Sequence, residues 1–295
     1  MNRVFEFKIT DEYSGMTVSD ILRGRYEMSG SLIKDLKKYA DGLLLNNEHI
    51  RTVDTVKPGD ILRITMHDKS SETIEPEDMK LDIVYEDEDI LIINKPSGIP
   101  THPSQGHFTG TLANGVAAHY IKNGEEHTFR AVNRLDKDTS GLMCVAKNSY
   151  SHARLVSGIK NSSLRRKYRA IVIGTPDDCG VIDAPIDRED GLKRCVADTG
   201  KNAVTHYRLL ESHGGYSLVE LELETGRTHQ IRVHMAYIGH PLLGDWLYGK
   251  EDKELFPRQA LHSSYLELIH PVTFEKLCFC AELPDDMREF LIKTE

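Results

Sequence analysis

The stretch that decides the fold is Val132-Asn133-Arg134-Leu135-Asp136-Lys137-Asp138-Thr139-Ser140-Gly141-Leu142. It places charges of both signs within a few residues, then a Thr-Ser-Gly turn, and then an apolar run that continues to Val145. Clusters of charge most often face solvent, so the stretch alone leaves two alternatives. It is either a solvated loop between strands or a loop that carries chemistry.

Length and composition describe an ordinary globular protein. The chain has 295 residues, of which 39% are hydrophobic and 28% are charged, and this length favours one large and one small domain. The apolar runs are too short to span a bilayer and the N-terminus lacks the apolar core of a signal peptide, so we expect a cytoplasmic protein without a membrane partner. The five cysteines contain no Cys-x-x-Cys pair, which fits neither a disulfide framework nor a zinc finger.

The net charge of −9 argues at first against a nucleic-acid partner. Its distribution changes this conclusion. Residues 71–90 hold 9 acidic residues against 1 basic residue, whereas residues 130–172 hold 10 basic residues against 2 acidic ones. A strongly basic segment therefore surrounds the stretch quoted above, and it can bind an anionic partner.

The pattern predicts a small α-then-β module at residues 1–70, an acidic linker at 71–82 and a larger domain at 83–295. Two short amphipathic helices are expected in the module, the second starting at Ser29 or Ser31 as N-cap and ending at Gly42, with strands after it. The larger domain combines many strands with few helices. One of these helices is expected to follow Thr228 as its N-cap. Without regular βαβ alternation, this pattern predicts an α+β fold with a mixed, mostly antiparallel sheet.

The stretch resembles the catalytic loop of the RluA family of RNA pseudouridine synthases. That family shows His-Arg-Leu-Asp, two variable residues and Thr-Ser-Gly, and this chain has Asn133 in place of the His. Three further motifs follow the family's order, and residues 14–67 resemble the small RNA-binding module that precedes this domain in many members. They are Asn94-Lys95-Pro96-Ser97-Gly98, Arg166-Lys167-Tyr168-Arg169-Ala170 and Thr225-Gly226-Arg227-Thr228-His229-Gln230-Ile231-Arg232.

The resemblance implies a catalytic set. Pseudouridylation breaks the bond between ribose and a uracil nitrogen, turns the base and rejoins it through carbon, so it needs a carboxylate but neither a metal nor an organic cofactor. The matched nucleophile is Asp136, and the resemblance assigns Arg227 as the basic group that keeps Asp136 ionised. Tyr168 is matched to a residue that stacks on the uracil and can remove a proton. An isolated tyrosine on such a strand could equally fill the core.

The partner implied by the resemblance is RNA, most often large-subunit ribosomal RNA, bound by a monomer. The target uridine must leave its stack, and basic side chains that hold the distorted backbone offset that cost. The candidate RNA-binding residues are Arg134, Arg165, Arg166, Lys167, Lys34, Lys37 and Lys38.

Four alternatives remain at this point. The histidines near the C-terminal end invite a metal site, but His229 and His234 do not share one face of a helix or strand. Asp136 and Asp138 could be the paired carboxylates of a glycosidase. The chain could also bind RNA without catalysis, or modify transfer RNA instead of ribosomal RNA.

Overall fold

The computed structural model describes residues 2–67, 74–104, 108–250, 252 and 254–294. The N-terminal module has an antiparallel sheet in the order β1-β4-β2-β3, together with two short helices. Its elements are β1 (Asn2–Lys8), α1 (Val18–Gly24), α2 (Gly30–Leu36), β2 (Leu43–Leu45), β3 (Glu48–His49) and β4 (Ile61–His67). The predicted helices and later strands are present, and β1 adds a first strand that the α-then-β prediction lacks.

The second helix of the module starts as predicted and ends earlier. The Ser29 hydroxyl accepts the Leu32 N–H, so Ser29 is the N-cap. Helix α2 ends at Leu36, and the prediction that Gly42 ends it was wrong. Gly42 has a different role, because a Cβ at this position would collide with the carbonyl oxygen of Leu36.

The larger domain is built on a ten-stranded sheet in the order β10-β13-β14-β9-β15-β8-β6-β5, with β16 on β15 and β7 on β8. Every pairing is antiparallel except β15 with β8, which confirms the α+β class. The strands are β5 (Ile83–Glu86), β6 (Ile90–Lys95), β7 (Arg130–Ala131), β8 (Ser140–Ala146), β9 (Arg165–Ile173), β10 (Cys179–Asp183), β13 (Val204–His213), β14 (Tyr216–Leu223), β15 (Leu261–Ile269) and β16 (Lys276–Cys280).

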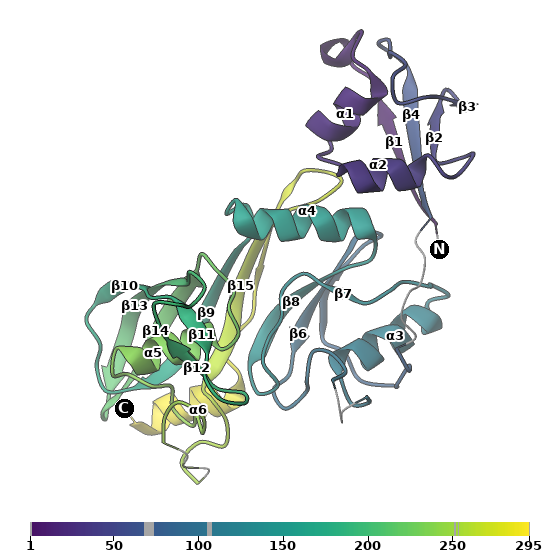
Figure 1. The fold of residues 1–295 in the computed structure, drawn as a ribbon. Coiled ribbons are helices and arrows are strands. Elements are labelled where there is room, and N and C mark those ends of the chain that lie inside the picture. Colours follow the sequence, from purple (N-terminus) through teal and green to yellow (C-terminus); the bar gives the residue numbers. More distant parts are fainter. Residues whose placement is uncertain (1, 68–73, 105–107, 251, 253, 295) are drawn as a thin grey trace.

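Both faces of this sheet are covered, which explains the continuous apolar runs. In β6, Leu91 and Ile93 enter one apolar cluster and Ile90 and Ile92 enter another. Helix α3 (Leu112–Lys122) packs in the first cluster and α4 (Ser149–Lys160) in the second (Figure 1). The remaining elements of the domain are the ribbon β11 (Ile186–Arg188) with β12 (Arg194–Val196), and helices α5 (Gln230–Tyr237) and α6 (Asp285–Thr294).

The described part of the acidic linker, residues 74–82, lies against the larger domain. Its backbone hydrogen-bonds to α3, because Asn114 donates its side-chain N–H to Glu75 O and its carbonyl accepts the Glu77 N–H. Ile74 and Leu81 pack on the main core. This segment is therefore extended but docked, and the first part of the predicted linker, residues 71–73, lies outside the described residues.

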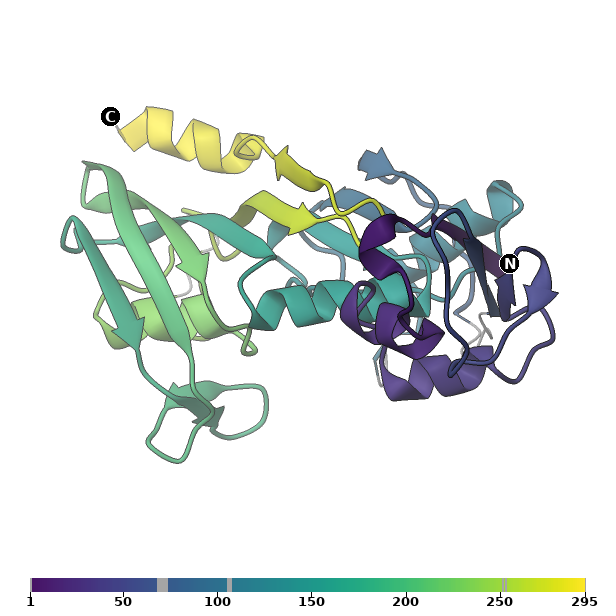
Figure 2. The same cartoon turned by 90° about the horizontal axis from the view of Figure 1, so that it is seen from above.

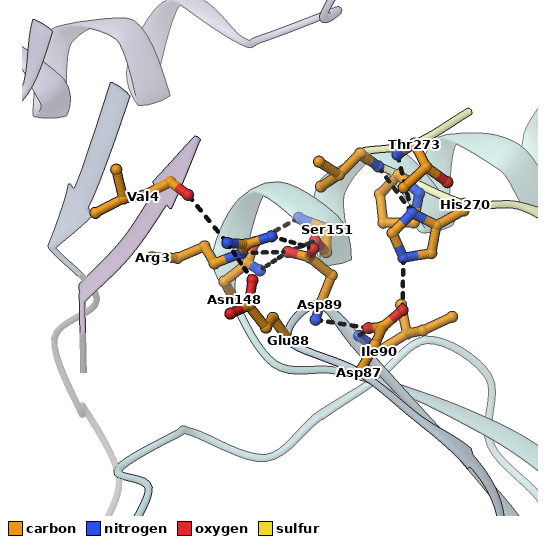
Figure 3. Close-up of polar contacts among 12 residues, drawn as sticks. Arg3, Val4, Asp87, Glu88, Asp89, Ile90, Asn148, Ser151, His270 and Thr273 are labelled. Carbon is orange, nitrogen blue, oxygen red and sulfur yellow. Dashed lines mark hydrogen bonds and ion pairs between the residues drawn. The ribbon is translucent and has the colours of Figure 1, made fainter. Parts of the chain in front are cut away.

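The N-terminal module docks on the start of α4 and on the β15–β16 turn, at the opposite end of the molecule from the ribbon β11–β12 (Figure 2). Arg3 of β1 reaches Asp89 of the larger domain with two hydrogen bonds of 3.0 and 2.7 Å (Figure 3). Asp89 is 2% exposed and also accepts the Asn148 side-chain N–H. Beside this pair, the Tyr150 ring meets the Phe5 ring edge-on at 5.4 Å. An ion pair with a buried carboxylate and an aromatic contact thus join the two parts.

Candidate active site

Three of the four sequence motifs meet around one cavity of about 570 Å³, and the fourth, at Asn94–Gly98, lies outside its wall. Its wall combines the loop that carries Asp136, the inward face of β9 with Arg166 and Tyr168, and residues 223–232 before and within α5. Val156, Ile159 and Lys160 of α4 complete it. The fold therefore brings distant segments to one place, as expected for a ligand site.

Asn133, the residue at the family's His position, holds the Asp136 loop against β8. It is buried, its side-chain oxygen accepts the Cys144 N–H at 2.9 Å, and its side-chain N–H donates to Leu142 O at 3.4 Å. Both partners lie on β8, the strand into which the loop continues. The side chain of Asn133 therefore has a structural role: it fixes where the loop leaves the sheet.

Two buried cations hold the far side of the same loop through its carbonyl groups. Lys95 donates to Lys137 O at 3.0 Å, and also to the carbonyls of Pro96 and Ile99. Arg258 donates to Asp138 O at 3.1 Å. Burial lowers the pKa of Lys95 to about 7, although the nearby carboxylates Asp138 and Asp136 favour its charged form.

Asp136 is paired with Arg232, whose Nη1 lies 3.2 Å from Asp136 Oδ2. The other edge of the guanidinium forms two hydrogen bonds, of 2.7 and 2.8 Å, with the fully buried Asp245. Burial of Arg232 opposes its charge, but hydrogen bonds and charge from Asp245, together with Asp136, raise its pKa above the ordinary value. Arg232 is therefore a fixed cation that pairs with the carboxylate of Asp136.

The prediction that Arg227 is the basic group beside Asp136 was wrong. Arg227 lines the cavity, but its Nε donates to Asn202 O at 2.9 Å. The predicted Thr228 N-cap was also wrong, since α5 starts after His229, which has a left-handed backbone. Arg232 belongs to the same motif as Arg227, and the motif alone does not indicate which arginine the start of α5 turns toward Asp136.

Tyr168 borders the cavity from β9 and is 5% exposed. As its alternation indicates, it shares a sheet face with Ala170 and Val172, and all three belong to the main core cluster. Burial raises the pKa of Tyr168, and the charge of Asp136 acts in the same direction. The side chain is therefore a neutral phenol at neutral pH, with its ring in the core and one side on the cavity.

The predicted RNA-binding residues divide into three groups. Arg134 is exposed and Arg166 is buried, and both line the cavity. Arg165 and Lys167 lie on the other face of β9, where their side chains pair with Glu222 and Glu220 of β14.

The third group belongs to the N-terminal module, and its side chains are exposed. Lys34 lies on α2, and Lys37 and Lys38 follow its last residue.

The histidines proposed for a metal site engage protein partners instead. His234 lies within 2.9 Å of Thr205 Oγ1 and of Ala184 O, and His262 Nδ1 lies 2.9 Å from Ser140 Oγ. Among the described residues, the one group with metal-ligand spacing is Asp87, Asp89 and His270. Its lone pairs are engaged, since Asp89 accepts from Arg3 and His270 Nδ1 accepts the Thr273 N–H (Figure 3).

Comparison with known proteins identifies the reaction. The RNA pseudouridylate synthase family matches residues 89–237, which include the Asp136 loop, β9 and α5. The chain belongs to this family. It is an RNA pseudouridine synthase, an isomerase that acts on RNA, which confirms the family and the activity predicted from the sequence. In the described part of the synthase, no helix has the length and apolarity that a membrane crossing requires.

Relatives and solved structures agree with this assignment. The synthase is 44% identical to the RNA pseudouridine synthase YjbO of Bacillus subtilis, over 95% of this chain and 99% of the relative. It is 43% identical to the ribosomal large subunit pseudouridine synthase D of Pseudomonas aeruginosa, over 86% and 82%. The structure of human RNA pseudouridylate synthase domain containing 4 matches with a TM-score of 0.58 and 26% identity, over 72% of this chain and 92% of that chain.

Proposed function

We propose that the synthase isomerises specific uridines of large-subunit ribosomal RNA, with Asp136 as the nucleophile. The observation that carries the assignment is the position of Asp136: it projects into the cavity as a partly exposed carboxylate paired with the buried Arg232. Relatives named as ribosomal large subunit synthases support the substrate class. Such RNA is found in the cytoplasm, where we expect the enzyme to act as a monomer.

The reaction needs an ionised carboxylate whether it attacks the ribose or the uracil. The bond between ribose C1′ and N1 breaks, C1′ bonds to C5, the C5 hydrogen leaves as a proton, and N1 gains a proton. Arg232 supports this step by holding the carboxylate of Asp136 in an ion pair at the cavity. The reaction is redox-neutral, so the proposal includes no cofactor.

The cavity offers groups for an extruded uridine. The Tyr168 ring can stack on the uracil, and its neutral hydroxyl can exchange a proton with the base. Arg166 is 5% exposed, and its Nε and Nη2 have no hydrogen-bond partner among the described residues. A buried guanidinium with unmet donors favours an anionic or carbonyl ligand, which a flipped nucleotide supplies.

We assign the remaining contacts to the RNA backbone. Arg134 at the rim of the cavity holds the flipped-out state, and Lys34, Lys37 and Lys38 of the module, residues 1–70, provide a second phosphate contact. Residues 71–82 are the linker, and residues 83–295 are the catalytic domain. Arg165 and Lys167 contribute less, because each already pairs with a glutamate.

Mapping pseudouridine across ribosomal and transfer RNA in a deletion strain tests the substrate. Loss of specific large-subunit sites, restored by the wild-type gene, is the expected result. Loss of sites in transfer RNA alone would contradict the proposed substrate and identify transfer RNA in its place. An unchanged map would indicate that the protein only binds RNA.

A further inference from the structure

His229, at the start of α5, has a backbone conformation that side chains rarely adopt. Its φ is 59° and its ψ is 18°, in the left-handed region, and its side chain does not cap the helix. Such strain in a residue that is not glycine persists only where surrounding contacts fix it, and it concentrates at functional sites. His229 lines the cavity, so its strained backbone belongs to the candidate active site.

Tyr248 determines which nitrogen of the His229 ring carries the proton. The Tyr248 hydroxyl oxygen accepts the backbone N–H of Arg194 at 2.9 Å, and the same oxygen lies 2.9 Å from His229 Nδ1. Among the described residues, Nδ1 is the one acceptor within hydrogen-bond distance of this hydroxyl, so we assign the hydroxyl as the donor to Nδ1. In the neutral ring the remaining proton then lies on Nε2. Nε2 is the nitrogen that faces Asp136, 3.8 Å from Oδ2.

Both N–H groups that face Asp136 approach the same oxygen. Arg232 Nη1 and His229 Nε2 lie 3.2 and 3.8 Å from Oδ2, and among the described residues no hydrogen bond reaches Oδ1. One short turn supports both groups. Asp245 holds Arg232, Tyr248 holds His229, and the Tyr248 N–H donates to Asp245 Oδ1.

We propose that His229 is a positioning residue for Asp136: its Nε2–H faces Oδ2 from 3.8 Å beside Arg232, which favours the orientation that leaves Oδ1 directed to the substrate. The inference rests on the proposed role of Asp136. Tyr248 acts one step further out, since it sets which ring nitrogen carries the proton. Neither side chain needs to contact the RNA for this role, so both should affect the rate of the bound complex more than its affinity.

The test uses full-length enzyme and RNA from a strain that lacks it, labelled with tritium at C5 of uridine. Pseudouridine formation releases this tritium, so single-turnover rates at saturating enzyme report the chemical step, and RNA binding is measured separately. His229→Gly keeps the backbone conformation accessible. We expect it to slow release about 10- to 100-fold, with the RNA dissociation constant changed less than about twofold.

Tyr248→Phe provides a second variant in case His229→Gly is poorly folded. We expect it to slow release about 3- to 10-fold, and to add nothing further in the His229→Gly background, because it acts through the ring. The exposed Tyr237→Phe is the matched control, with the wild-type rate expected.

Three results would overturn the inference: a wild-type rate in His229→Gly or Tyr248→Phe, independent effects in the double variant, or a loss confined to RNA affinity. If wild-type enzyme released no tritium, the proposed function would fail, and this inference with it. A normal wild-type rate with an unaffected His229→Gly rate would overturn the inference alone.

Discussion

Arg232 forms an ion pair with Asp136 through one edge of its guanidinium group, and Asp245 binds the other edge and fixes the side chain. The pair joins α5 to the Asp136 loop, two segments almost a hundred residues apart in the sequence. An arginine fixed in this way cannot turn to another partner when RNA enters. The negative charge of Asp136 is therefore compensated before the substrate binds.

Replacing Arg232 should abolish most of the activity. Arg232→Ala removes the cation beside Asp136 and leaves the buried carboxylate of Asp245 without its cation. We expect a single-turnover rate at least about 100-fold lower and a loss of about 3 to 5 kcal/mol in unfolding free energy. Rates and urea unfolding curves measure the two effects.

Arg227→Ala is the matched control for Arg232, because Arg227 comes from the same motif and lines the same cavity. It should retain the rate at saturating enzyme within about fivefold and weaken RNA binding. Equal losses of rate in the two variants would show that the ion pair with Asp136 is not what the arginine contributes.

Asn133 should matter for stability more than for chemistry. Asn133→Ala leaves the buried Cys144 N–H without its side-chain acceptor. The expected cost is about 1 to 3 kcal/mol in unfolding free energy, with a modest loss of rate as the loop loosens. A urea midpoint equal to that of the wild type would contradict this role.

The contact between module and catalytic domain should depend on Arg3. Arg3→Ala leaves the carboxylate of Asp89 buried without its cation, and we expect the module to become separately accessible to limited proteolysis (Figure 3). Arg63→Ala, which breaks the exposed pair of Arg63 with Glu6, is the control and should leave the digestion pattern unchanged. An Arg3→Ala digestion pattern identical to the wild type would contradict this dependence.

Activity should fall in acid because of His229. Burial lowers the pKa of His229 below its ordinary 6.5, Asp136 and Asp245 oppose this, and Arg232 and Arg194 add to it. The ring is therefore neutral at pH 7 and gains a proton as the pH falls below 6.5. An imidazolium would bind Asp136 more tightly and slow its attack. The rate–pH profile of His229→Gly should lack this acid limb, and its persistence there would assign the limb to another group.

Much of this arrangement could be predicted from local sequence. The alternation around Tyr168 correctly indicated its sheet face, since a period of two is a property of the strand itself. The prediction for the module lacked β1. This strand pairs with β4, some sixty residues away, and pairing at that range leaves no local signal. The same limit applies to the parallel pairing of β15 with β8.

The arginine beside Asp136 shows a subtler limit. Arg227 and Arg232 belong to one motif, and the choice between them depends on how the chain turns into α5. That turn is made by the left-handed backbone of His229, a conformation uncommon for any residue other than glycine, so the motif alone does not indicate it. The acidic Asp245 that selects Arg232 is also distant from the motif.

The most direct test of the central claim is tritium release from C5-labelled RNA by Asp136→Asn, a variant that keeps the size of the side chain and removes its charge. The account predicts RNA affinity within a few-fold of the wild type and no detectable release. Release at the wild-type rate would contradict it, because the chemistry would then not depend on the carboxylate of Asp136.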